Sequence, residues 1–380
     1  MKIAFITLGY KPLRTSGLDL SGERLVTALL DANHHVTVVA GMREKADEVH
    51  IHPNLNIYRI QLDQSDWIGF GYRAAKLLPK LGQFDVIHFW DIHFGWAFRG
   101  KFIGSLQHSF HQRLKSLDYA PKKSISWITR FAYYWIAHQL AELPALKRAN
   151  GLIAGSTTTR DEFSRHYGVR DDLVAIAPHG VDTLFFQPSK NSTPMRRKLG
   201  LQDDEQVLLF VGFITRRKGL ETLIKALPLI QPTPRLLILG KWRSQTYRRE
   251  VFSLLNSFER FVLEIGFAPD EEMPEYFSLA DVYVSSSFLE GFGLPLAESL
   301  ACETPVVALD TGSVAEVVGE GGILIKENCP EFLAEGIITL LKDEQLRHKM
   351  GKYGRQHIMR EFSMEAMLEK TLAAYEKFQK

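Results

Sequence analysis

The sequence predicts an α/β protein with two Rossmann-like, doubly wound domains that face each other across a central cleft. Its 380 residues exceed what one hydrophobic core usually organises, since cores stop growing near ~250–300 residues. Short apolar runs alternate with amphipathic runs of helical length, as in parallel sheets with right-handed crossovers. This alternation occurs twice, with the polar, proline-containing segment 186–194 between the two series.

The first series begins at the N-terminus. Its expected buried strands are 3–8, 36–39, 85–89, 102–106 and 151–154. Between the first two strands, Leu25, Val26 and Leu29 share one helical face, and we expect this helix to begin at Gly22 with Ser21 as its N-cap. An edge strand and turn over 168–181 precede the linker, where we favour His179 as a hinge residue over a ligand contact.

The second series follows residue 205. Its expected strands are 207–211, 235–239, 261–265, 281–285, 304–308 and 322–325. Helical runs at 220–227 and 296–301 lie between strands. The domains are therefore expected at 1–185 and 186–362. Because ligands of open parallel sheets bind beyond the carboxyl ends of the strands, the loops after the strands are the place to seek chemistry.

Composition excludes several classes of protein. With 45% hydrophobic and 24% charged residues, the chain is not largely disordered. Two cysteines, Cys302 and Cys329, cannot build a disulfide framework and suit a reducing compartment. The apolar stretch 125–146 is interrupted by Arg130 and Glu142, so it is not a membrane span. We expect a cytoplasmic protein, with peripheral attachment to the inner face of the membrane as an open alternative.

The net charge of +2 conceals an asymmetry and gives no argument for nucleic acid as a partner. Residues 99–148 carry nine basic and two acidic side chains, a local charge of +7. Trp127, Phe131 and Trp135 lie in the same segment. Aromatic and basic residues together suit the interface of an anionic membrane, while a core-packed helix with a solvated basic face is the alternative.

Several common motifs are missing. No Gly-x-Gly-x-x-Gly fingerprint follows a strand, which argues against a nicotinamide enzyme. The absence of Gly-x-Ser-x-Gly and of His-Glu-x-x-His argues against a serine hydrolase elbow and a zinc protease site. No Asp-x-Asp pair is present, which argues against a diphosphate held through a chelated metal.

Three consecutive cations, Arg216, Arg217 and Lys218, open a helix after the expected strand 207–211 and Gly212. Cations at a helix N-terminus oppose the helix dipole, so a purely structural role is unattractive. A bound anion removes this conflict, and we favour an anion site over a solvated charge run.

A glycine-rich turn follows the expected strand 281–285. Gly291 and Gly293 let backbone amides approach a ligand closely, and Pro295 suits the first turn of a helix. Glu290 precedes the turn and Glu298 lies one turn into the helix. Carboxylates accept hydrogen bonds from sugar hydroxyls, so one could contact a hexose and the other a ribose. The alternative is a dipole-compensating carboxylate and a solvated helix residue.

With these residues in place, the chain resembles, over nearly its whole length, the retaining nucleotide-sugar glycosyltransferases of family 4, which have the GT-B architecture. The most specific likeness is Glu290 and Glu298 with seven residues between them. Supporting segments are 178–182, 217–219, 301–307, 316–318 and the pair Gly321-Gly322. The resemblance implies an acceptor site on the first domain, a nucleotide-sugar site on the second, and a last helix, 363–380, that packs back on the first domain.

The resemblance also implies roles for single residues. Lys218, with Arg216 or Arg217, would hold the diphosphate. Glu290 would contact the transferred sugar and Glu298 the ribose. The remaining implied contacts are Gly212, Gly291, Phe292, Gly293 and Leu294 for sugar and phosphate, Phe267 for the base, Gly17 and Gly22 in the first loop, and His108 as the active-site histidine. Catalysis is then expected from His108, Lys218 and Glu290, with no metal and no further cofactor.

The sequence departs from the family pattern in two places. Phe213 stands where the family usually has arginine directly after the strand-end glycine, and Gly17 and Gly22 are separated where the family often has paired glycines. We expect a metal-independent, retaining transferase that moves a hexose from a UDP or GDP sugar to a glycan, glycolipid or lipid-linked acceptor. The alternatives are a GT-B epimerase or hydrolase, and a catalytically idle nucleotide-sugar binding module.

Overall fold

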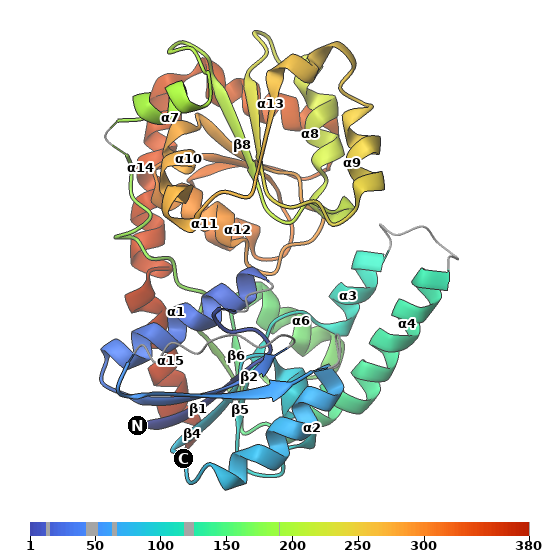
Figure 1. Ribbon diagram of the computed structural model, residues 1–380, viewed down its shortest axis with the longest axis vertical. Coiled ribbons are helices and arrows are strands. Elements are labelled where there is room, and N and C mark those ends of the chain that lie inside the picture. The colour runs from blue at the N-terminus through green and yellow to red at the C-terminus, as the bar shows by residue number, and fades with distance from the viewer. Residues whose placement is uncertain (13–15, 43–51, 63–66, 118–124, 190, 380) are drawn as a thin grey trace. The chain divides into compact units, whose positions relative to one another are not determined.

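The computed structural model describes residues 1–12, 16–42, 52–62, 67–117, 125–189 and 191–379 (Figure 1). Lys122 and Lys123, which contribute to the basic segment of the sequence, lie outside these ranges. The chain divides into two compact units. Unit 1 comprises Met1–Gly180 and Met364–Lys380, and unit 2 comprises Val181–Ser363. The division falls five residues before the expected boundary at 185.

Unit 1 contains a parallel sheet with the strand order β3-β2-β1-β4-β5-β6-β7. The strands are β1 (Lys2–Thr7), β2 (His35–Met42), β3 (Leu55–Gln61), β4 (Val86–Phe89), β5 (Ile103–Leu106), β6 (Gly151–Ala154) and β7 (Val174–Ile176). The helices are α1 (Gly17–Asp31), α2 (Trp67–Leu77), α3 (Phe110–Leu117), α4 (Ile125–Ala137), α5 (Leu143–Arg148), α6 (Thr157–Tyr167) and α15 (Met364–Gln379).

The period of two in each strand explains how this sheet is buried on both faces. Ile3 and Phe5 of β1 enter one apolar cluster, and Ala4 and Ile6 enter the other. The C-terminal helix α15 completes the first cluster with Tyr375, whose side chain is fully buried. Tyr375 and the Nδ1 atom of His88 are hydrogen-bonded at 2.8 Å, which ties α15 to β4.

Unit 2 contains a second parallel sheet with the order β10-β9-β8-β11-β12-β13. The strands are β8 (Val207–Val211), β9 (Arg235–Leu239), β10 (Val262–Gly266), β11 (Val282–Ser285), β12 (Val306–Leu309) and β13 (Gly322–Ile325). The helices are α7 (Thr193–Lys198), α8 (Leu220–Ala226), α9 (Gln245–Phe252), α10 (Met273–Leu279), α11 (Leu294–Ala301), α12 (Val314–Val318), α13 (Pro330–Lys342) and α14 (Glu344–Glu361).

These two sheets confirm the prediction of two Rossmann-like, doubly wound folds. In each sheet the strand order reverses direction at one point, between β1 and β4 in unit 1 and between β8 and β11 in unit 2. Crevices at such switch points, beyond the carboxyl ends of the strands, are where open α/β sheets bind ligands.

Two expectations about unit 1 were wrong. Helix α1 begins at Gly17 rather than Gly22, and its N-cap is Ser16, whose hydroxyl accepts the Asp19 amide, rather than Ser21. Strand β3 was not expected. It is an edge strand that buries Leu55 and Ile60 but leaves Asn56 and Tyr58 at least partly open, so it lacks a continuous apolar run.

Candidate active site

The best-defined cluster of functional residues lies at the switch point of unit 2. The loops after β8 and β11 meet there, and both carry residues singled out by the sequence. After β8 the backbone turns at Gly212, whose φ of +144° disfavours any other residue. A single 3₁₀ turn, Arg216–Lys218, then places three cations before α8.

Gly219 joins this turn to α8 and permits a very close approach to the other loop. Its φ is +65°, and a Cβ atom there would stand 2.1 Å from the carbonyl oxygen of Ser286. The hydroxyl of Ser286 donates back to the carbonyl of Gly219 at 2.8 Å. Only glycine fits here, and the contact fixes the lysine-bearing turn against the loop that carries Glu290.

Lys218 and Glu290 form the centre of the cluster. The Lys218 ammonium group donates a hydrogen bond to the Glu290 carboxylate, and Arg217 lies 4.0 Å from the second carboxylate oxygen. Arg217 also donates to the carbonyl of Leu289. Burial alone would raise the pKa of Glu290, but the positive charges of Lys218 and Arg217 hold the pKa below its usual range. The glutamate is therefore a buried carboxylate between two cations.

Arg216 has a different environment. Its guanidinium pairs with Glu250 and lies 3.9 Å from Glu221, and it sits over the ring of Tyr247 at 4.8 Å. Burial is the largest cause that raises the pKa of Tyr247. The hydrogen bond to Glu221 and the negative charge of Glu221 raise it further. Of the two arginines that the sequence offered, Arg217 is the one that the structure brings to Glu290.

The glycine-rich turn leads from Glu290 into α11. Gly293 has a φ of +87° and precedes the first helical residue, Leu294, with no side chain capping the helix. Phe292 is buried, and Glu298 is buried inside α11. The amide of Leu294 therefore belongs to an N-terminus that suits a negative group, which is the geometry by which helices bind phosphate.

Two further residues shape this turn and were missed by sequence reasoning. A Cβ atom at Gly312, whose φ is +58°, would stand 2.0 Å from the carbonyl oxygen of Glu290. The hydroxyl of Ser313 donates to the carbonyl of Gly291 at 2.6 Å. Both lie in the loop after β12, and the only available signal was the Thr-Gly-Ser sequence after an apolar run.

Aromatic side chains are exposed at the carboxyl ends of β8 and β10. Phe267, directly after β10, is 81% exposed, and Phe213 is 41% exposed. The guanidinium of Arg243 lies 4.6 Å from the centre of the Phe213 ring. A cation thus accompanies Phe213 at the strand end where the family pattern has arginine.

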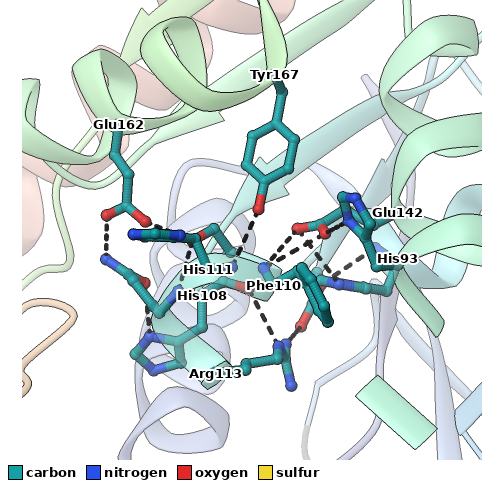
Figure 2. A network of polar contacts seen from close by, with 12 residues as sticks. His93, His108, Phe110, His111, Arg113, Glu142, Glu162 and Tyr167 are labelled. Carbon is teal, nitrogen blue, oxygen red and sulfur yellow. Dashed lines mark hydrogen bonds and ion pairs between the residues drawn. The ribbon is translucent and has the colours of Figure 1, made fainter. Parts of the chain in front are cut away.

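His108 belongs to unit 1, two residues after β5, and its side chain is half-buried. It precedes α3 inside a dense polar network, which Figure 2 shows from close by. Asp91 and His93, from the loop after β4, form one end of this network. Burial alone would raise the pKa of Asp91, but His93 and Arg113 hold it below its usual range. Burial and the charge of Glu142 raise the pKa of Tyr167 to about 12.

Gly17 and Gly22, which the family resemblance places in a substrate-binding loop, both lie in helix α1. Gly22 lies within α1, where a Cβ atom would stand 3.0 Å from Nε1 of Trp90, so its close approach is to that ring. Gly17 is the first residue of α1. His179 is buried and hydrogen-bonded to the hydroxyl of Ser21 at 2.6 Å. Burial, with the charges of His108 and Arg24, lowers the pKa of His179 to about 4.

In the described ranges, no three His, Cys, Asp or Glu side chains come together in an arrangement that could hold a metal ion. At the switch point of unit 2, two cations and the buried carboxylate of Glu290 converge instead. Such a set can bind an anionic group beside a hydroxyl-bearing one, as in a sugar phosphate.

Comparison with known proteins places this fold and site in a family. Residues 16–184 match the family model described as Glycosyltransferase Family 4, and residues 191–357 match the model described as Glycosyl transferases group 1. The alpha-maltose-1-phosphate synthase of Mycolicibacterium smegmatis is 30% identical over 64% of this chain and 69% of that protein. The chain belongs to the family 4-like glycosyltransferases. It is therefore an enzyme that transfers glycosyl groups, and the expected family and GT-B fold are confirmed.

Solved structures of the same fold cover this glycosyltransferase almost completely. The sucrose-phosphate synthase of Thermosynechococcus elongatus superposes with a TM-score of 0.82 at 23% identity, over 99% of this chain and 98% of that one. The HepE protein of Anabaena, solved in complex with UDP-glucose, gives a TM-score of 0.76 at 20% identity, over 98% and 99% of the two chains. At these identities the likeness shows the shared fold.

Proposed function

We propose that the protein is a retaining hexosyltransferase that moves a hexose from a nucleotide-diphosphate sugar to a hydroxyl group, without a metal ion. The observation that carries this proposal is the cluster of Lys218, Arg217 and Glu290 at the switch point of unit 2. It combines cations and an uncapped helix N-terminus with a buried carboxylate, which match the diphosphate and the sugar of one donor molecule.

The reaction breaks the bond between the anomeric carbon and the diphosphate oxygen, and forms a bond from that carbon to the acceptor oxygen. Negative charge develops on the departing diphosphate, where Lys218, Arg217 and the N-terminus of α11 would stabilise it. In retention by same-face attack, the leaving phosphate oxygen takes the proton of the acceptor hydroxyl. No carboxylate nucleophile is needed, so Glu290 is assigned to sugar hydroxyls.

The remaining assignments follow the family resemblance. Glu298 would hold the ribose, and Phe267 would lie against the base. Gly291 to Leu294 would supply backbone contacts to sugar and phosphate, with Gly212 close to the diphosphate. His108 would contact the reacting sugar from unit 1. Direct binding of UDP-glucose by HepE, which shares this fold, supports a nucleotide-sugar donor.

A screen of thermal stability against nucleotide sugars tests the proposal. UDP- and GDP-linked glucose, mannose and N-acetylglucosamine are the first ligands, with a chelator present throughout. The best donor is then incubated with glycan and lipid-linked acceptors, and the anomeric configuration of the product is measured by NMR. A retained configuration in an acceptor-linked product supports the proposal. Donor consumption without such a product identifies an epimerase or hydrolase, and binding without consumption identifies an idle module.

We further propose a lipid-linked or membrane-proximal glycan as the acceptor, reached by docking on an anionic membrane at the cytoplasmic face. Helix α4 exposes Ile128, Phe131 and Trp135, which lie at spacings of three and seven residues on one helical face. Ile136 and the following Leu140 extend this apolar surface. It belongs to the segment with a charge of +7, and such a combination favours anionic lipid interfaces.

No helix in the described part of the chain has the length and apolarity to cross a bilayer. We assign the docking surface to the exposed face of α4. Figure 1 shows α4 beside α3, and the two helices contact each other within unit 1. Since α3 directly follows His108, a membrane bound by α4 would lie near this residue of the proposed reaction site.

A further inference from the structure

The first turn of α3, directly after His108, has its backbone amides occupied by side chains. The amide of Phe110 donates to both carboxylate oxygens of Glu142, at 3.2 and 3.3 Å. The amide of His111 donates to the Tyr167 hydroxyl at 3.2 Å. The amide of Gln112 donates to the hydroxyl of Ser109 at 3.0 Å. This helix start is closed to an outside anion, and the backbone after His108 is held by two other elements, the π-helical turn His138–Glu142 and α6, as well as by the local Ser109 (Figure 2).

The backbone of His108 itself is also held. Nε of Arg113 donates to the carbonyl of His108 at 3.2 Å, and a terminal nitrogen of the same arginine lies 3.4 Å from Asp91. His138 and Glu142 are hydrogen-bonded at 2.5 Å, and the ring of His138 stacks on Phe110 at 4.5 Å. The position of the His108 ring is therefore decided mainly by what its side chain contacts.

The side chain of His108 contacts Gln112, which in turn contacts Glu162 of α6. Nε2 of Gln112 donates to one carboxylate oxygen of Glu162 at 2.5 Å, and the Ser109 hydroxyl donates to the other. A carboxylate can only accept, so Glu162 forces the NH₂ end of the Gln112 amide toward itself. The amide oxygen of Gln112 must then face His108, and it lies 3.3 Å from Nδ1 of that ring.

We propose that Glu162, acting through Gln112, sets the tautomer of His108. An amide oxygen carries no proton, so the shared hydrogen must sit on Nδ1 of the neutral ring. Nε2 then holds the lone pair and acts as the hydrogen-bond acceptor. This inference rests on the proposed function, in which His108 contacts the reacting sugar. With that tautomer, His108 accepts a hydrogen bond from a sugar hydroxyl, and Glu162 and Gln112 are positioning residues.

Helix capping alone does not explain the contact between Glu162 and Gln112. Ser109 already caps the Gln112 amide, and the other two amides of the turn are bound by Glu142 and Tyr167. The hydrogen bond from the Gln112 side chain adds nothing to the pairing of backbone groups. Its specific effect is to orient an amide that is buried and cannot exchange its two ends freely with water.

The test is a ¹⁵N NMR measurement of His108 in the full-length protein, with the ring signals assigned by their loss in His108→Asn. We expect Nδ1 to be protonated in the neutral ring of the wild type. A wild-type ring protonated on Nε2 overturns the proposal. In Glu162→Gln the amide at position 162 can donate, so the orientation of Gln112 is no longer fixed and the Nδ1–H tautomer is lost from a large fraction of molecules.

An exchange of the two side chains provides a rescue. In the double variant Gln112→Glu/Glu162→Gln, the new carboxylate faces Nδ1 of His108 and accepts from the amide at 162, while that amide's oxygen still accepts from Ser109. Every contact still joins one donor to one acceptor, with the bond between 112 and 162 reversed in direction, so the tautomer should return. A merely structural role of Glu162 predicts no change of tautomer in either variant, and that result also overturns the proposal.

Turnover separates this inference from the proposed function. We expect Glu162→Gln to lower kcat on the order of 10-fold with an unchanged donor Kd, and the exchange variant to recover most of it. Asp161→Asn, which removes an exposed carboxylate one residue away on α6, is the matched control and should leave both quantities unchanged. If His108→Asn keeps full turnover, the catalytic role of His108 fails while the NMR result on the tautomer still stands.

Discussion

The ammonium group of Lys218 donates a hydrogen bond to the carboxylate of Glu290, although the two residues are 72 positions apart in the chain. Their side chains are only 14% and 10% exposed. Lys218 reaches this position because Gly219 lets its turn pack directly on Ser286, and Glu290 follows from the same loop. The pair is therefore a product of the contact between β8 and β11 at the switch point.

Removal of either charge should abolish most transfer while the fold survives. In Lys218→Met the departing diphosphate loses one of its two proposed cations, and in Glu290→Gln the sugar loses a charged hydrogen-bond acceptor. We expect kcat to fall on the order of 10²–10³-fold in each variant, which is the usual effect of removing one preorganised group that stabilises the transition state. Turnover is measured with the donor found by the stability screen.

Arg216→Met is the matched control for these variants. It removes the adjacent cation, whose partners are Glu250 and Glu221 rather than Glu290. We expect at most a modest change of kcat. Near-normal turnover in Lys218→Met, or an equally large loss in Arg216→Met, would contradict the assignment of the diphosphate to Lys218 and Arg217.

The same pair should give a pH-dependent contribution to stability. The folded pKa of Glu290 is lowered, so its charged form stabilises the fold above the unfolded pKa of about 4.3, and this contribution is lost as the pH falls through the folded value. Lys218→Met removes the largest influence that lowers this pKa while burial and Arg217 remain, so we expect the folded pKa to rise and the buried glutamate to take up a proton at higher pH than in the wild type. The variant should be most destabilised at neutral pH and least near pH 4.5.

Denaturant unfolding of the wild type and Lys218→Met between pH 4.5 and 7.5 measures this difference. Lys225→Met, which removes an exposed lysine from α8, controls for the loss of a positive charge in general. A difference in free energy of unfolding that stays constant over this range would show that Glu290 is not the group that Lys218 keeps ionised.

Much of the fold could be predicted from the sequence because strands buried on both faces are continuous apolar runs. The runs at 207–211 and 235–239 became β8 and β9 with unchanged ends. Edge strand β3 was missed because only two of its residues, Leu55 and Ile60, are buried and they are not adjacent, so it has no continuous apolar run. The start of α1 was misplaced because Ser21 and Gly22 form a plausible cap locally, whereas Ser16 bonds the Asp19 amide and Gly22 packs on Trp90.

The candidate site was only partly accessible to sequence reasoning. Lys218 and Glu290 were recognised because each stands in a local motif, and the motifs resemble those of a family. The network around His108 carries no local motif. Glu162 and Ser109 are 53 residues apart, and Glu142 and Phe110 are 32 apart, so their contacts depend on how α3, α6 and the π-helical turn His138–Glu142 pack.

Gly312 should be essential for the shape of the donor loop, although it touches no substrate in our proposal. In Gly312→Ala the new methyl group would collide with the Glu290 carbonyl, and the residue would also need a positive φ. We expect a loss of stability of about 1–3 kcal/mol. Displacement of Glu290 should raise the donor KM as well.

Gly168→Ala is the control for this variant. It has a comparable φ of +64° with nothing within 4 Å of a new Cβ atom, so it reports backbone strain alone. Both variants are compared by unfolding and by steady-state kinetics. If Gly312→Ala affects stability no more than Gly168→Ala and leaves KM unchanged, the contact with Glu290 does not constrain the loop.

His88 should make unit 1 sensitive to acid. Its buried ring is hydrogen-bonded to Tyr375 and Ser105, and burial lowers its pKa to about 3. The unfolded chain binds a proton near pH 6.5 but the folded protein does not, so stability falls as the pH drops from 6.5 toward 3. The expected slope is about 1.4 kcal/mol per pH unit.

Unfolding of the wild type, His88→Gln and His35→Gln between pH 4.5 and 7.5 measures this contribution. His88→Gln should be less stable at neutral pH but should lose part of the slope. His35 is exposed, so its variant should keep the wild-type slope. Parallel stability curves for His88→Gln and the wild type would show that His88 is not the group responsible.

The exposed face of α4 should bind anionic membranes. Phe131 and Trp135 are 38% and 50% exposed, so they are free to enter a lipid interface without disturbing the core of unit 1. We expect the wild type to sediment with vesicles that contain phosphatidylglycerol and to remain in solution with pure phosphatidylcholine. The variant Phe131→Ser/Trp135→Ser should partition about tenfold more weakly, because most of the inserted apolar area is lost.

Phe332→Ser is the control: it removes a 46% exposed aromatic ring from α13 of unit 2 and should bind like the wild type. Equal partition of the wild type onto anionic and neutral vesicles would exclude charge-assisted docking, and equal partition of all three proteins onto anionic vesicles would exclude α4 as the docking surface.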